Sequence, residues 1–224
     1  MSRALLALLI AGAAVLVGCS TTPREPDRVA TEVVADLDYR PTHPPYGSIE
    51  VEPLRDRRPS YELGRENYLN ESYYSEDLFR RPVPATLRRV AERELVTSGV
   101  FAAAPSTGRP HYLLRLTLIH FTARADRDLL GLIPVVPSVE VEARFTADVL
   151  LTDRDGRRFL EKRYDVTRTA TTSTLGNVES TSADLLLMAM GDVIGSLVRD
   201  ADQGVDAFWR ELGFDPVAPA IPGP

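Results

Sequence analysis

The feature that most constrains the fold is a run of alternating residues from Val139 to Leu151. Seven residues in it are apolar and recur at every second position, while Glu140, Glu142, Arg144, Thr146 and Asp148 stand between them. The apolar row is Val139, Val141, Ala143, Phe145, Ala147, Val149 and Leu151. A period of two is the signature of a half-buried β-strand. We therefore expect a sheet that buries one face and leaves the other polar.

The segments on either side supply further strands. "DRDG" at 153–156 predicts a tight turn, and "RRFLEKRYDVTRTA" after it returns as the second arm of a hairpin. Before the run, "HYLLRLTL" at 111–118 alternates in the same way. "SIEVEP" at 48–53 predicts a first strand, and a short apolar stretch begins at Val100 and Phe101.

Two segments have helical spacing. The first opens at Pro84, which suits a first helical turn, and stops near Gly99. The second is expected to begin with a cap between Thr181 and Asp184 and to present one apolar stripe. That stripe is Leu186, Ala189, Met190, Val193, Ile194, Leu197 and Val198. The order β-α-β-β-β-β-α predicts an α+β fold: a mixed, mostly antiparallel sheet with two helices packed on one face.

The first twenty residues point to an envelope location. Arg3 precedes an uncharged apolar run of 14 residues, Ala4 to Val17, which is too short to span a bilayer of ~30 Å as a helix. The run ends in Leu-Val-Gly before Cys19 and resembles the lipobox of bacterial lipoproteins. The resemblance implies cleavage before Cys19, a diacylglycerol thioether on its sulfur and N-acylation of the new terminus, with no other cofactor. A single-pass anchor with a buried cysteine is the alternative.

The predicted organisation has four parts. Residues 1–18 form the signal peptide, and 19–47, rich in Pro and Thr, form a flexible tether that carries the lipid. Residues 48–212 form a single α+β domain, and 213–224 form a proline-rich disordered tail. The one cysteine excludes disulfides. The net charge of −6 argues against a nucleic-acid partner.

The search for catalytic chemistry finds no constellation in the sequence. His43, His111 and His120 have no metal-ligand spacing, no G-x-S-x-G elbow occurs, and no glycine loop suits a phosphate. Glu140 and Glu142 are more typical of a solvated strand face than of an acid–base pair. We therefore expect a protein that is not an enzyme and binds no metal.

The order of motifs resembles a family of envelope lipoproteins. The relevant stretches are "SIEVEPLRDRRP", "LVTSGVF", "HYLLRLTL" and "VLLTDRDGRRF". The family includes the YajG-type lipoproteins, the LpoB-type peptidoglycan-synthase activators and the curli-channel lipoprotein, all related to the amino-terminal domain of TolB. Its members share a fold without sharing a function. Ser20, where an aspartate would favour inner-membrane retention, implies an outer-membrane protein on the periplasmic face.

Two segments are candidate contact surfaces. "LLGLIPVVP" joins two strands and is unusually apolar, so it is expected to contact a partner or the membrane, unless it folds onto its own core. Its apolar residues are Leu129, Leu130, Leu132, Ile133, Val135 and Val136. The segment 55–83 combines arginines with Tyr61, Tyr68, Tyr73 and Tyr74 and has no regular period. It is expected to contact a partner, unless its aromatic residues cover the sheet edge.

These features support two functional hypotheses. The first is an outer-membrane lipoprotein that is held to the membrane by its lipid and acts as a non-catalytic accessory or assembly subunit of a cell-envelope complex, with an envelope protein as its partner. The alternative is a periplasmic module that binds lipid or glycan and assists an intermembrane transporter. That alternative needs a concave apolar site, which the sheet face opposite the helices could supply.

Overall fold

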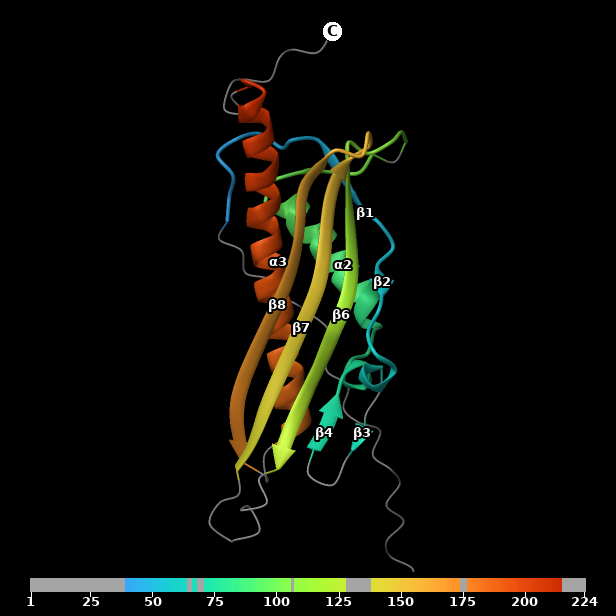
Figure 1. Cartoon of the computed structure of the whole chain (residues 1–224), viewed down its shortest axis with the longest axis vertical. Helices are drawn as coiled ribbons and strands as arrows, with labels where there is room; N and C mark the ends of the chain where they lie inside the picture. Colours follow the sequence, from blue (N-terminus) through green and yellow to red (C-terminus); the bar gives the residue numbers. More distant parts are fainter. Residues whose placement is uncertain are drawn as a thin grey trace, which may run out of the picture.

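The computed structural model describes residues 39–63, 66–67, 71–105, 107–127, 138–173 and 177–214. Cys19, the predicted signal peptide, most of the predicted tether and nearly all of the tail lie outside these ranges. Within them, eight strands form one mixed sheet, and the two α-helices lie behind it in Figure 1. The predicted α+β class is confirmed.

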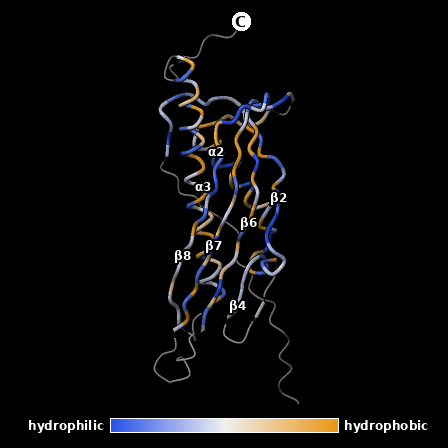
Figure 2. The backbone as a smooth tube through the Cα atoms, viewed as in Figure 1, coloured by the Kyte–Doolittle hydropathy of each residue, from blue (hydrophilic) through white to orange (hydrophobic). Residues whose placement is uncertain are grey.

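Three long strands form the body of the sheet. They are β6 (Tyr112–Arg127), β7 (Ser138–Asp153) and β8 (Arg158–Ser173), each of 16 residues and antiparallel to its neighbour. At ~3.3 Å per residue such strands extend about 50 Å. The alternation along β7 has the expected result, because Val141, Phe145 and Leu151 are fully buried. Figure 2 shows the hydrophilic and hydrophobic residues alternating along these strands.

The other edge of β6 is shared among short strands. Strand β1 (Ser48–Val51) runs parallel to β6 and also pairs with β5 (Ala102–Ala103). Strand β2 (Arg55–Asp56) continues along β6 in the parallel direction. Beyond it, β4 (Glu71–Tyr74) pairs antiparallel with the end of β6, and β3 (Glu66–Asn67) pairs with β4. Short 3-10 turns at Ser60–Glu62 and Glu76–Leu78, η1 and η2, connect these pieces.

The two helices cover the apolar face. Helix α2 (Val83–Thr97) has Pro84 in its first turn and ends before Gly99, whose φ of 88° is left-handed. Helix α3 (Val178–Glu211) begins earlier than predicted, because Asn177 rather than Thr181 caps it: the Asn177 side chain accepts a 3.0 Å hydrogen bond from the Ser180 N–H.

Helix α3 is long and apolar enough to cross a membrane by length and composition alone. However, 61% of its most apolar window is buried inside the domain. It packs on β6, β7 and β8, and its backbone approaches β8 closely at Gly204. A Cβ at Gly204 would stand 2.3 Å from the Phe159 carbonyl oxygen of β8. Helix α3 is therefore the main core helix of the domain.

Residues 39–47, which the sequence assigned to the flexible tether, pack against α3 instead; we call them the strap. The Tyr39 hydroxyl donates to Oδ2 of Asp202, and the Nε2 atom of His43 lies 2.6 Å from Oδ1. His43 also stacks on Tyr46 with ring centroids 4.0 Å apart. The predicted boundary at residue 48 missed this because the partner, Asp202, lies far away in the sequence. Residues 39–47 therefore belong to the domain rather than to a flexible tether.

Candidate functional site

The candidate site is the face of the sheet opposite the two helices, which we call the open face. Its side chains stand in rungs across β2, β6, β7 and β8, because paired residues point to the same side. The central rung is Arg55, Thr117, Asp148 and Arg163. The rungs beside it are Arg115, Leu150 and Glu161 on one side and His120, Thr146 and Asp165 on the other. Figure 1 looks onto this face.

Ion pairs fix most of the charges on the open face. Arg163 binds Asp148 through both guanidinium contacts, at 2.6 and 2.9 Å, and Arg144 binds Asp165 at 3.1 and 2.8 Å. The Arg163 hydrogen bonds hold the pKa of Asp148 below its usual range, and those of Arg144 do the same for the pKa of Asp165. These carboxylates therefore stay ionised into mildly acidic conditions.

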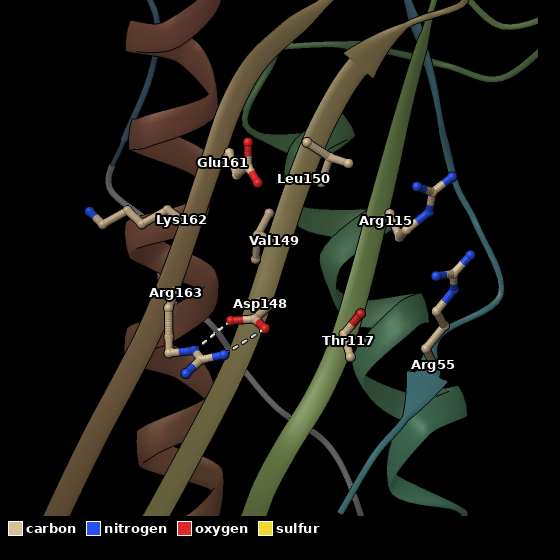
Figure 3. Close-up of a pocket in the computed structure, with 9 residues that line it drawn as sticks. All are labelled: Arg55, Arg115, Thr117, Asp148, Val149, Leu150, Glu161, Lys162 and Arg163. Carbon is tan, nitrogen blue, oxygen red and sulfur yellow. Dashed lines mark hydrogen bonds and ion pairs between the residues drawn. The ribbon is translucent and has the colours of Figure 1, made fainter. Parts of the chain in front are cut away.

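A shallow groove of about 570 Å³ lies across the central rung. Figure 3 shows Arg55 and Arg115 projecting side by side at one margin, with the Asp148–Arg163 pair toward the other. Arg115 is held by Glu52, with contacts of 2.8 and 3.2 Å that raise the pKa of its guanidinium. Among the described residues, the groove lining combines the apolar side chains of Val149 and Leu150 with charged side chains and the hydroxyl of Thr117. The concave apolar site that the alternative hypothesis requires stays a prediction.

Glu62 and His120 form a pair that sequence reasoning missed. Strand β2 ends its pairing at Leu118, and β4 begins its pairing at Ala123, which leaves a gap on the edge of β6. Glu62, only 2% exposed, fills part of this gap: one oxygen accepts the Phe121 N–H at 3.1 Å, and the other lies 2.7 Å from Nδ1 of His120.

A β-bulge between Leu118 and His120 aims the imidazole at Glu62. Nothing near Glu62 or His120 in the sequence predicts the pair, because 58 positions separate the two residues. In the described ranges no group of three His, Cys, Asp or Glu side chains is arranged to hold a metal ion. The pair satisfies the backbone of β6 and orients the imidazole at the margin of the open face.

The segment 55–83 is fixed to the sheet by Arg58. Its side chain is fully buried and donates to Asp56 and Glu76, at 2.6 Å each, and to Ser75 at 3.3 Å. The Ser75 hydroxyl donates in turn to the Phe121 carbonyl at 2.6 Å. These bonds replace the missing ladder at the gap in β6. The segment therefore covers the edge of β6 with polar side chains, whereas the alternative given for it above assigned that cover to its aromatic residues.

The structure buries one of the predicted contact residues and leaves others exposed or half-buried. Tyr74 is 2% exposed and belongs to the core, which corrects its assignment as a contact residue. Tyr61 is 45% exposed, and its ring meets that of half-buried Tyr73 edge to face at 6.5 Å. Tyr68 and the "LLGLIPVVP" residues lie outside the described ranges. Arg127 and Ser138, which flank that segment, stand at the same end of the sheet as β3 and β4.

No protein-family model matches the chain, and no curated protein matches it. Several solved structures are similar. A Xanthomonas campestris protein has 15% identity and a TM-score of 0.46, with 84% of this chain and 92% of that chain covered. A minor lipoprotein of Acinetobacter baumannii has 11% identity and a TM-score of 0.36, covering 72% and 95%. Rare lipoprotein B of Shewanella oneidensis has 13% and 0.30, covering 75% and 99%.

Bacterial lipoproteins are thus among the structures to which this chain is similar, as the sequence resemblance predicted. Likeness at this level assigns no activity and no partner.

Proposed function

We propose that the protein is an outer-membrane lipoprotein, anchored by lipid on Cys19, that serves as a non-catalytic accessory or assembly subunit of a cell-envelope complex. The lipobox supports the anchor. The observation that carries the role as a subunit is the open face: a wide, charged sheet surface behind which both helices of the described domain lie. Its partner in this proposal is an envelope protein that lies across the rungs.

The charges of the open face suit a macromolecular partner better than a small substrate. The groove is shallow, and its carboxylates are engaged by arginines rather than left free for proton transfer. A protein surface with the complementary pattern of charges can contact several rungs at once, because fixed ion pairs present a defined pattern of both signs.

The strap leaves this surface free. It holds the beginning of the ordered chain against Asp202 of α3, on the helical side of the sheet. The 19 residues from 20 to 38 that join the strap to Cys19 would span roughly 25 Å if flexible. The contacts of Tyr39 and His43 thus lie on the side of the sheet that the helices occupy and do not cover the open face.

The anchor is tested by feeding labelled palmitate to cells that produce the wild type or Cys19→Ala. We expect label in the wild type only; equal labelling of both chains, or of neither, would refute the anchor. The docking surface is tested in the same cells with a photo-crosslinking amino acid at Thr117 of the open face, and at Ala85 of α2 as the control.

We expect protein adducts at position 117 and few at position 85. An equal yield at both positions would count against the open face. Native mass spectrometry of the purified chain distinguishes the proposed subunit from the alternative binding module. A co-purified lipid or glycan would favour the binding module.

A further inference from the structure

We propose that the open face recognises an acidic segment of the partner protein through Arg55 and Arg57. This inference rests on the proposed function and names the chemistry of the partner. Both arginines are exposed at the β2 margin of the face, where the backbone of Arg55 pairs with Thr117 and the Arg57 N–H donates to the Leu118 carbonyl at 2.8 Å.

A charge balance of the open face singles out these two residues. Five arginines there have carboxylate partners: Arg115 with Glu52, Arg163 with Asp148, Arg144 with Asp165, Arg158 with Glu161, and Arg124 with Asp126. Among the described residues, neither the Arg55 nor the Arg57 guanidinium forms a hydrogen bond or a close ion pair, although the charge of Arg57 contributes to the lowered pKa of Asp148. The residues that line the groove include four basic side chains, Arg55, Arg115, Lys162 and Arg163, and two acidic ones, Asp148 and Glu161, on a chain whose net charge is −6.

The surroundings of Arg55 favour a carboxylate ligand. Arg115 lies beside it, as Figure 3 shows, and is held in place by Glu52, so its guanidinium needs little reorganisation. Thr117 stands between Arg55 and Asp148 in the same view, and its hydroxyl supplies a further donor for such a ligand. Guanidinium groups present paired N–H donors that match the two oxygens of a carboxylate.

The fixed carboxylates decide between a protein and a membrane as the source of this anion. Asp148 and Glu161 line the same groove, and Asp165 and Glu52 stand next to it. A bilayer of phosphate headgroups would meet these four negative charges together with the arginines. A protein segment can place its acidic side chains on Arg55 and Arg57 and neutral or basic ones on the carboxylates. We therefore assign the site to an acidic protein segment.

The test compares Arg55→Glu/Arg57→Glu with Arg89→Glu/Arg109→Glu. The second pair makes the same change of charge at exposed positions away from the open face. Each mature lipidated chain is purified in a nonionic detergent and titrated with poly-L-glutamate and, separately, with inorganic phosphate. We expect polyglutamate to bind the wild type and the control alike, and to bind the Arg55/Arg57 variant about tenfold more weakly or worse. Binding to the wild type should also weaken as salt is raised.

Several outcomes would overturn the inference. Equal loss of binding in both variants would show an effect of net charge alone. Phosphate that binds as tightly as polyglutamate, with the same dependence on Arg55 and Arg57, would reassign the site to phosphate headgroups. All four arginines are exposed, so both variants should melt with the wild type. If the Arg55→Glu/Arg57→Glu variant has a lower melting temperature, Arg55→Gln/Arg57→Gln is tested in its place. That variant must then lose binding to polyglutamate.

The crosslinker at Thr117 separates this inference from the proposed function. Protein adducts that disappear in Arg55→Glu/Arg57→Glu and persist in the control support both. Adducts that persist in both variants retain the docking surface and overturn the role of the two arginines. If position 117 gives no adduct in the wild type, the docking surface itself fails, whatever polyglutamate binds.

Discussion

The close approach of α3 to β8 at Gly204 gives a sharp test of the fold. A methyl group at Gly204 would stand 2.3 Å from the Phe159 carbonyl oxygen, about 1 Å inside ordinary carbon–oxygen contact. The obstacle is backbone of a long strand, so it cannot rotate away as a side chain would. Gly204→Ala must therefore shift α3 or β8. Overpacking of this kind costs ~1–3 kcal/mol, and the gain of ~1 kcal/mol in helix propensity offsets only part of the larger costs.

Gly191 provides a matched control in the same helix. An added Cβ there meets nothing within 4 Å, so Gly191→Ala gains the propensity term without a clash. We expect the free energy of unfolding to fall by ~1–2 kcal/mol in Gly204→Ala and to rise by ~0.5–1 kcal/mol in Gly191→Ala. For a domain of this size these changes correspond to melting temperatures ~3–8 °C lower and ~2–4 °C higher.

Thermal and urea unfolding, followed by circular dichroism on the purified full-length chains, measure both changes. The comparison depends on the sign of the change in the free energy of unfolding rather than on its size, since both substitutions are Gly→Ala and lie in one helix. If Gly204→Ala were as stable as Gly191→Ala, α3 could not lie against β8 as described, and the packing of the core helix would have to be revised.

Two further predictions concern buried polar anchors. The hydrogen bonds of Arg58 lower the pKa of Asp56, so the stability from this pair is complete above pH ~4 and is lost as the pH falls through the lowered pKa. Arg58→Met should therefore flatten this acid dependence in urea titrations between pH 2 and 5; an unchanged slope would contradict the role of the pair. Asp202→Ala removes the acceptor that holds the strap, so chymotrypsin should cleave after Tyr39 at least several-fold faster, whereas Asp192→Ala, at an exposed ion pair, should leave that rate unchanged. Equal rates in the two variants would contradict the packing of the strap.

The regular elements could be predicted because each carries its own periodicity. The alternation from Val139 to Leu151 needs a covered face whatever pairs with it, and the apolar stripe of α3 needs a sheet to cover. Local composition also predicted the turn at 153–156. These features depend on residues that lie close together in the chain.

The irregular parts could not be predicted because their partners are distant. The strap depends on Asp202, which is 159 positions from His43, and the edge cover depends on contacts of Glu62 and Ser75 with Phe121. A segment stabilised in this way shows polar and aromatic residues without a period, which resembles a loop. The same property concealed the candidate site, because arginines on separate strands become neighbours only when the register is known.

The open face also shows how a structural requirement can supply a functional surface. A sheet that buries one apolar row per strand must carry polar residues on the other row, and a dense array of charges is tolerated there only when opposite signs are paired. On this face the pairing accounts for Arg115, Arg144, Arg158 and Arg163. Arg55 stands on β2, a strand of two residues at the margin, and Arg57 follows directly after it, where fold stability needs neither charge. Residues that the fold does not use are those that a partner can use, and this is why the proposed recognition is assigned to β2 rather than to the long strands.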